Sequence, residues 1–268
     1  MAKKTDAQAS HDAARWQVPI GGKGFDLKDC DPAAKPYSSG DKTADKTRVT
    51  DLAREIDALQ DVFWADKRFK LLVLLQGTDT AGKDGTIRAV FKETSPLGVR
   101  VVGWKAPSEL ERSHDYLWRI HHEMPASGEF MIHNRSHYED VLVPVVERWI
   151  DKKTTEQRYR QINDFERMLS ENGTVIMKFM LHIGFDEQRR RLQERIDDPA
   201  KHWKFSLGAL DGGTGRQQDA PQPDDRHAGA RQAEVAQAAL PARQSRAERP
   251  ARAVKSSASS YQKHRRQT

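Results

Sequence analysis

The chain has 268 residues, with 45 basic and 39 acidic side chains and a formal net charge of +6. This length is enough for one large α/β domain, with or without tails. No apolar run approaches the length of about 18 residues that a membrane-spanning helix needs, and no signal peptide is predicted at the start. One cysteine excludes an internal disulfide. The basic excess is spread along the chain, so a solvated surface explains it as simply as an anionic partner does. We expect a cytoplasmic protein.

Short apolar runs alternate with helical patterns over much of the chain. Residues 1–50 are polar, contain Gly and Pro, and are expected to form an irregular arm. Apolar residues then recur at helical spacing from Leu52 to Phe63. Further strands are expected at 70–76, 99–102, 129–133 and 174–181, and further helices at 87–92, 110–123, 157–170 and 186–195. This alternation predicts an α/β core over residues 51–207, with a parallel sheet covered by helices on both faces.

The composition changes near Leu207. Of the 20 aromatic residues (6 Trp, 5 Tyr and 9 Phe), only Tyr261 lies beyond Phe205. The segment 208–268 is rich in Ala, Arg, Gln, Pro and Gly, and has few large aliphatic residues. Such a segment cannot bury enough apolar surface to offset its ordering entropy, so we expect a disordered tail.

The strongest local signal for function is Gly77-Thr78-Asp79-Thr80-Ala81-Gly82-Lys83, which fits G-x-x-x-x-G-K. It follows the expected strand 70–76 and precedes a helical pattern, which is the setting that a phosphate-binding P-loop requires. The glycines let backbone N–H groups turn onto phosphate oxygens, and the helix N-terminus adds partial positive charge. Lys83 would reach the β- and γ-phosphates. A plain glycine turn is the alternative interpretation.

The residues around this lysine depart from the usual P-loop. Asp84 stands where Ser or Thr usually holds Mg²⁺, and Gly85 and Thr86 follow it. Asp79 lies inside the loop, where a carboxylate would repel phosphate unless a cation lies between them. Asp79 is therefore a candidate Mg²⁺ ligand or acceptor-orienting residue, with a turn residue as the alternative.

A second group of polar residues begins where the strand at 129–133 ends. Ligands bind at the carboxyl ends of parallel strands. Asn134 stands where a P-loop enzyme usually carries a metal-binding aspartate, and Glu139 is the nearest carboxylate that could replace it. Arg135 could clamp a phosphate with two hydrogen bonds. A surface ion pair between Arg135 and Glu139 is the alternative.

Two further groups carry candidate roles. Asp115 and Arg119 lie four residues apart on one face of the helix expected at 110–123, and with Lys105 they predict either an acceptor site or a surface ion pair. The last expected helix carries four candidate lid residues: Arg189, Arg190, Arg191 and Arg195. Such a run is typical of a solvated helix, and it also suits a mobile lid that neutralises a polyanion.

Several blocks, in order, resemble the polyphosphate kinase 2 family. The P-loop matches the family form G-x-D-x-x-G-K-D-G, and further blocks match at 114–119, 134–143, 158–166 and 192–199. The resemblance extends over residues 15–207, and the Asn134 form is similar to the class III branch. It implies a fold like thymidylate kinase with a helical lid, and Mg²⁺-dependent transfer (with Mn²⁺ as a substitute) from inorganic polyphosphate to AMP or ADP. It also implies an oligomer, and neither nucleic acid nor membrane as a partner.

The resemblance implies roles for particular residues. The implied catalytic residues are Asp79, Lys83, Arg135 and Glu139, of which Asp79 and Glu139 would also bind the metal. The implied phosphate- and nucleotide-binding residues are Gly77, Gly82, Lys83, Asp84, Gly85, Thr86, Lys105, Asp115, Arg119, Asn134 and Arg135. The arginines at 189–191 and 195 would form the polyphosphate lid.

Two alternative functions remain open at this point. One is an ATP-dependent nucleoside monophosphate kinase. The other is a degenerate, non-catalytic phosphate-binding protein, because the family's Trp- and Tyr-bearing helix, Ala-Pro-Trp strand and closing helix are missing after Leu210. The tail resembles an out-of-frame reading of a GC-rich gene. We expect its composition to leave an apolar edge or face of the core uncovered.

Overall fold

The core of the protein is a parallel sheet between two layers of helices. The computed structural model describes residues 17–18 and 25–200. The sheet has four strands in the order β2-β3-β1-β4, formed by Val99–Gly103, Phe130–Asn134, Lys70–Gly77 and Thr174–Leu181. All neighbouring strands are parallel, and Val73 of β1 lies opposite Ile132 of β3 and Met177 of β4. The predicted α/β fold with a parallel sheet is thus confirmed.

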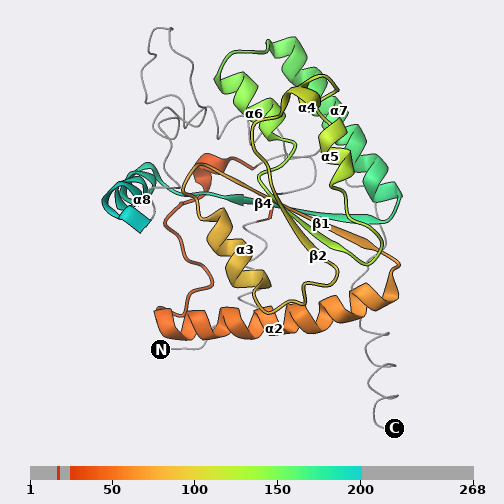
Figure 1. Ribbon diagram of the computed structural model, residues 1–268. Coiled ribbons are helices and arrows are strands. Elements are labelled where there is room, and N and C mark those ends of the chain that lie inside the picture. The colour runs from red at the N-terminus through yellow and green to blue at the C-terminus, as the bar shows by residue number, and fades with distance from the viewer. Residues whose placement is uncertain (1–16, 19–24, 201–268) are drawn as a thin grey trace.

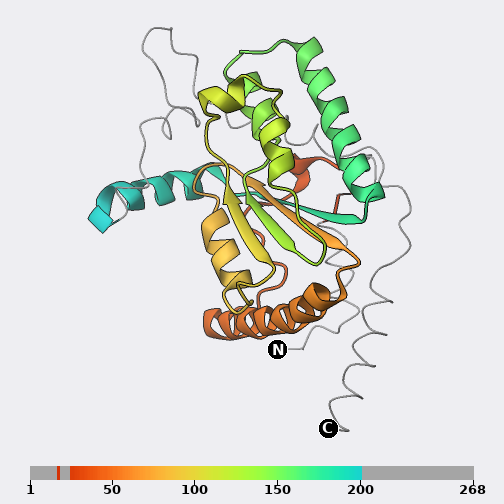
Figure 2. The same ribbon diagram turned by 45° about the vertical axis from the view of Figure 1, so that its right-hand side comes forward.

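The helices divide between the two faces of the sheet (Figures 1 and 2). Helices α2 (Lys42–Asp66) and α3 (Lys83–Phe91) cover one face. The other face carries α4 (Glu109–Arg112), α5 (Trp118–His122), α6 (Glu139–Val146) and α7 (Lys152–Glu171). A short 3-10 helix, η1 (Leu27–Asp29), precedes α2, and α8 (Phe185–Asp197) follows β4.

The alternation of side chains along β1 explains why both faces are covered. Leu72 and Leu74 pack into one buried cluster with residues of α5, α6 and α7, while Val73 and Leu75 pack into a second cluster that includes residues of α2 and α3. Successive residues of a strand point to opposite faces, so a wholly apolar strand needs apolar partners on both. The ends of β1 and β3 are thereby held next to each other at one edge of the sheet.

Three predicted boundaries were wrong. The irregular arm predicted for 1–50 ends at Asp41, because α2 begins at Lys42. Asp41 caps this helix by accepting hydrogen bonds from the N–H groups of Thr43 and Ala44. The first turns of α2 are mostly solvent-exposed, so they show no apolar periodicity in the sequence. Helix α3 begins at Lys83 rather than at residue 87, and α7 begins at Lys152 rather than at residue 157.

The single helix predicted for 110–123 does not form. Its place is taken by α4 and α5, which are separated by a turn at 113–117. Asp115 lies in this turn, where its carboxylate accepts a hydrogen bond from the N–H of Leu117 at 3.0 Å. Short polar side chains often bond nearby backbone in this way and so compete with helix formation. Asp115 and Arg119 therefore do not share a helix face.

The outer edge of the sheet is apolar. Strand β4 has no second neighbouring strand among the described residues, and its Met177 and Phe179 are each 44% exposed. The predicted disordered tail, 208–268, lies outside the described residues. None of the helices in the part of the chain that the structure describes is both long and apolar enough to cross a membrane.

Candidate active site

The P-loop follows β1 and bends sharply into α3. A Cβ atom at Gly77 would lie 2.7 Å from the carbonyl oxygen of Leu181, so the close approach of β4 requires glycine there. Gly82 has φ of +101° and precedes the first residue of α3. Thr80 has φ of +62°, which is rare for a non-glycine residue. This strained conformation lies inside the loop that was predicted to bind phosphate, where strain commonly serves function.

Lys83 is the first residue of α3, and its side chain turns back into the loop. Its ammonium donates hydrogen bonds to the carbonyl oxygens of Gly77, at 2.8 Å, and Thr78, at 3.0 Å. Burial lowers the pKa of Lys83, and the charge of Arg135 lowers it further, while the charges of Glu139, Asp79 and Asp84 act in the opposite direction. The ammonium is therefore within electrostatic reach of charged residues from the P-loop and from the turn after β3.

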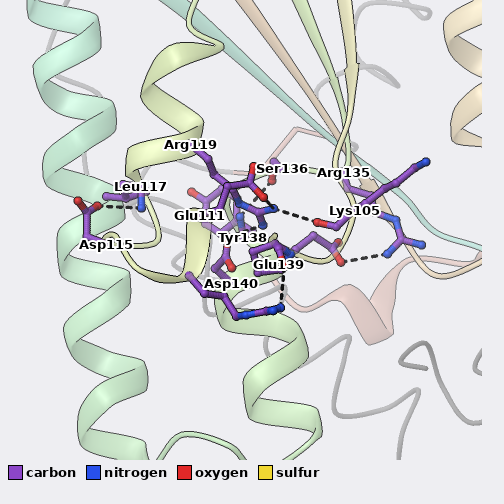
Figure 3. A network of polar contacts seen from close by, with 12 residues as sticks. Lys105, Glu111, Asp115, Leu117, Arg119, Arg135, Ser136, Tyr138, Glu139 and Asp140 are labelled. Carbon is purple, nitrogen blue, oxygen red and sulfur yellow. Dashed lines mark hydrogen bonds and ion pairs between the residues drawn. The ribbon is translucent and has the colours of Figure 1, made fainter. Parts of the chain in front are cut away.

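The turn after β3 presents Arg135 and Glu139 next to the P-loop. Arg135 has φ of +70°, and its backbone N–H donates to the carbonyl oxygen of Leu75 at 3.0 Å. Its guanidinium donates to the carboxylate of Glu139 at 3.3 Å, as Figure 3 shows. The side-chain amide of Asn134 donates to the carboxylate of Asp84 at 2.6 Å. These contacts join β3, α3 and the start of α6.

Helix α8 touches the P-loop with one face of its arginine run. Arg191 donates to the carbonyl oxygen of Thr80 at 3.0 Å, and Arg195 forms an ion pair with Asp79 at 3.1 Å. These two arginines are four residues apart and so lie on one helix face. Arg190 instead pairs with Glu187 and Glu194, and Arg189 is exposed. The predicted lid run is thus split between the P-loop and the solvent.

A cavity of about 410 Å³ opens beyond the carboxyl end of β2. It is lined by Val102, Gly103, Trp104, Lys105, Ala106, Glu111, Trp118, Arg119, His122 and Glu123. Arg119 is buried, donates to the carbonyl oxygen of Lys105 at 2.9 Å and pairs with Asp140 at 3.1 Å. The Nε1 atom of Trp104 and the Nε atom of Arg119 are buried without a partner among the described residues. The lining combines aromatic, apolar and charged side chains, as is typical of a ligand-binding cavity.

The structure brings most of the predicted residues together but sets Asp115, Arg189 and Arg190 apart from them. Residues from the P-loop, the turn after β3 and α8 meet around Lys83, and Lys105 and Arg119 line the neighbouring cavity. Asp115 does not line the cavity; its carboxylate faces the backbone of Leu117 (Figure 3). No role was predicted for the cavity residues Trp104, Glu111, Trp118 and Glu123. The same holds for Gln188, which donates to the carbonyl oxygen of Asp79 at 3.3 Å. The one feature of the sequence that could have indicated this cavity is Trp104, which lies between the end of a strand and Lys105.

Comparisons with known proteins agree with this arrangement. A family model described as Polyphosphate kinase 2 (PPK2) matches residues 39–213. An AMP/ADP-polyphosphate phosphotransferase of Meiothermus ruber is 49% identical over 197 residues, which cover 74% of this chain and 73% of that protein. An ADP-polyphosphate phosphotransferase of Rhodopseudomonas palustris is 41% identical over 165 residues, which cover 57% of each chain.

The fold comparison gives the same result. The crystal structure of polyphosphate kinase 2 from Arthrobacter aurescens matches with a TM-score of 0.70 and 35% sequence identity, over 90% of this chain and 94% of that one. The family match extends over more than half of the chain and includes the P-loop, the turn after β3 and α8. The resemblance noted from the sequence is confirmed, and the chain belongs to the polyphosphate kinase 2 family.

Proposed function

We propose that this protein transfers phosphoryl groups from inorganic polyphosphate to AMP or ADP in a Mg²⁺-dependent reaction. The observation that carries the proposal is the cluster around Lys83, where a P-loop, a second cationic side chain and several carboxylates meet. Phosphoryl transfer needs positioning and charge neutralisation more than it needs covalent chemistry from the protein. The names of the two curated relatives point to the same reaction.

In this reaction a bridging phosphorus–oxygen bond of polyphosphate breaks, and its electron pair stays on the shortened chain. A phosphate oxygen of the nucleotide forms the new bond. That oxygen already carries negative charge at neutral pH, so the site needs no general base. Lys83 and Arg135 would hold the oxygens of the transferring group and offset its charge. Asp79 and Glu139 would act through the metal.

The residues of this site fit a magnesium ion. Mg²⁺ prefers oxygen ligands, and in such enzymes it is held by one or two carboxylates together with substrate phosphates. Asp79 and Glu139 both act on the Lys83 ammonium, so both lie near the place where phosphates would bind. The described residues contain no group of three or more His, Cys, Asp or Glu side chains that could hold a metal ion. The bound ion would neutralise phosphate charge.

The cavity beside β2 and the arginines of α8 would bind the two substrates. The cavity beside β2 is lined by two tryptophan side chains and by the basic Lys105 and Arg119, and its volume of about 410 Å³ suits a nucleotide acceptor. Arg191 and Arg195 reach the P-loop from α8 and would contact the polyphosphate end that reacts. Arg189 and Arg190 would extend this basic surface along a longer polyanion. A cytoplasmic location and a homo-oligomer stay predictions.

One assay tests the proposal against its alternatives. Purified protein is incubated with Mg²⁺ and AMP or ADP, with either polyphosphate or ATP as the phosphoryl donor. Formation of ADP or ATP only with polyphosphate supports the proposed reaction. Transfer only from ATP would identify a nucleoside monophosphate kinase, and binding of polyphosphate without any transfer would identify a non-catalytic phosphate-binding protein.

The two metal-binding candidates give a direct prediction. Asp79→Asn and Glu139→Gln should each raise the Mg²⁺ concentration needed for half-maximal turnover by about tenfold, because each removes a charged oxygen ligand. Mn²⁺ binding followed by electron paramagnetic resonance should weaken in parallel. Asp186→Asn, on the exposed first turn of α8, is the matched control and should leave both titrations unchanged. Parent-like curves for both site variants would place the metal elsewhere.

The arginines of α8 give a prediction on substrate preference. Replacing Arg189, Arg190, Arg191 and Arg195 together with Gln should raise the KM for long polyphosphate by about tenfold, with a smaller change in the KM for nucleotide. Four like charges exceed what one nucleotide can use, and they suit a long polyanion. The difference should shrink with added salt, because contacts between exposed charges are screened. Equal increases in both KM values would return these arginines to a solvated helix surface.

A further inference from the structure

A buried group of charged and polar residues lies directly behind the turn that carries Arg135 and Glu139. Glu166 of α7 and Lys178 of β4 form an ion pair at 2.6 Å. The same carboxylate accepts hydrogen bonds from the hydroxyl of Tyr138, at 2.9 Å, and from Nε2 of His137, at 3.2 Å. Glu166, His137 and Tyr138 are each less than a tenth exposed. None of these residues belongs to the P-loop, the cavity beside β2 or α8.

Burying the charges of Glu166 and Lys178 costs free energy, so a contribution to stability does not by itself explain why they are buried. Burial acts to raise the pKa of Glu166, but the hydrogen bond from His137 and the charge of Lys178 outweigh this effect and bring the pKa down to about 2. The carboxylate is therefore ionised inside the core. Replacing a buried ion pair by apolar residues of similar volume is often neutral or stabilising, so the pair is weak evidence of a stabilising role. The function of this ion pair therefore lies in the positions that it imposes on neighbouring side chains.

That geometry acts on the turn between β3 and α6. His137 and Tyr138 lie between Arg135 and Glu139 in the chain, and Figure 3 shows Tyr138 beside Glu139. Arg135 has the uncommon φ of +70°, which persists only where the surroundings impose it. On its other side the turn is held by Ser136, whose hydroxyl accepts from the side chain of Gln76 at 3.0 Å. The turn is thus fixed from behind by α7 and β4 and from the front by β1.

We propose that Glu166 is a positioning residue of the phosphotransferase site, which through Tyr138 and His137 holds Arg135 and Glu139 in their working orientation. This inference rests on the proposed function of Arg135 but concerns residues that do not touch the substrate. Lys178 fixes the carboxylate and also donates to the hydroxyl of Tyr138 at 2.9 Å. Misplacement of a catalytic group by about 1 Å can cost about 10²-fold in rate.

A double-mutant cycle tests the proposal. Tyr138→Phe keeps the ring but removes the hydroxyl that joins the turn to Glu166 and Lys178. We expect turnover to fall about tenfold in the parent and less than about twofold in an Arg135→Ala background, because residues that act as a unit are not additive. The affinity for tripolyphosphate, measured by calorimetry, should show the same coupling. An equal loss in both backgrounds, or no loss in the parent, would overturn the proposal.

A matched control separates positioning from stability. Tyr116→Phe also removes a hydroxyl that contacts α7, where it donates to the side chain of Gln161 at 3.1 Å, but it does not touch the turn. This variant should lose a similar amount of thermal stability and keep its turnover within about twofold. The binding cycle also separates this proposal from the proposed function. Coupled tripolyphosphate affinities in a protein without transfer activity would contradict the function and support the positioning role.

A second pair of variants covers the case in which Tyr138→Phe does not fold. Glu166→Gln keeps the volume of the side chain but leaves the charge of Lys178 unpaired, so it should be unstable. Adding Lys178→Met removes that charge and should restore much of the melting temperature. We expect turnover to remain about tenfold or more below the parent in the double variant, because the hydrogen bonds to the turn are still altered. Recovery of both stability and turnover would overturn the positioning role.

Discussion

Lys83→Met should lower polyphosphate-dependent turnover by about 10³-fold or more while the protein stays folded. The lysine ammonium bonds two P-loop carbonyl groups and is within electrostatic reach of Arg135 and Glu139, so its removal takes a buried positive charge away from the transferring group. Methionine keeps the length and apolar stem of the side chain. The loss of two hydrogen bonds to loop carbonyl groups should cost stability only on the order of 1–3 kcal/mol. Steady-state kinetics and thermal unfolding measure the two effects.

Lys92→Met is the matched control for this prediction. Lys92 caps the other end of the same helix, α3, where its ammonium contacts Thr50 and Glu93 on the surface. The control removes the same charge from the same helix and should keep turnover within about twofold, since isolated surface ion pairs contribute little. Parent-like turnover in Lys83→Met itself would refute the P-loop assignment.

Arg135→Lys should lower turnover by about 10³-fold, although it preserves the charge. A guanidinium presents several donors in a fixed plane, and it can bind Glu139 and a phosphate at the same time. An ammonium is a point charge and cannot reproduce this geometry. The KM for nucleotide should change little, because the cavity beside β2 does not include Arg135. The kcat and KM values for both substrates are the required measurements.

Arg148→Lys provides the corresponding control. Arg148 also has a positive φ, of 59° compared with 70° for Arg135, but it is exposed and follows α6. Any general effect of placing lysine in this backbone conformation should therefore appear in both variants. Only the Arg135 variant should lose activity. A similar kcat for the two variants would show that Arg135 serves the backbone turn rather than the transferring phosphate.

Local patterns in the sequence were sufficient to predict the parallel core. Four apolar runs predicted every strand end to within one residue, and both ends of β4, at 174 and 181, agree without any shift. A strand buried on both faces must be apolar throughout, so it stands out in a sequence. The P-loop was equally readable, because its glycines and lysine are adjacent in the chain and follow such a strand. The family resemblance then supplied the substrates.

The tertiary structure determines which side chains from different segments of the chain come into contact. Asp115 and Arg119 fit a shared helix face by spacing, but Asp115 lies in the turn between α4 and α5, where its carboxylate bonds the N–H of Leu117. Arg191 and Arg195 look like the rest of their run, and only the packing of α8 brings them onto the P-loop. Glu166 and Lys178 are twelve residues apart in the chain, and they meet behind the turn that carries Arg135 and Glu139 because α7 packs against the sheet. Such pairings depend on long-range packing, which no local pattern of spacing or charge encodes.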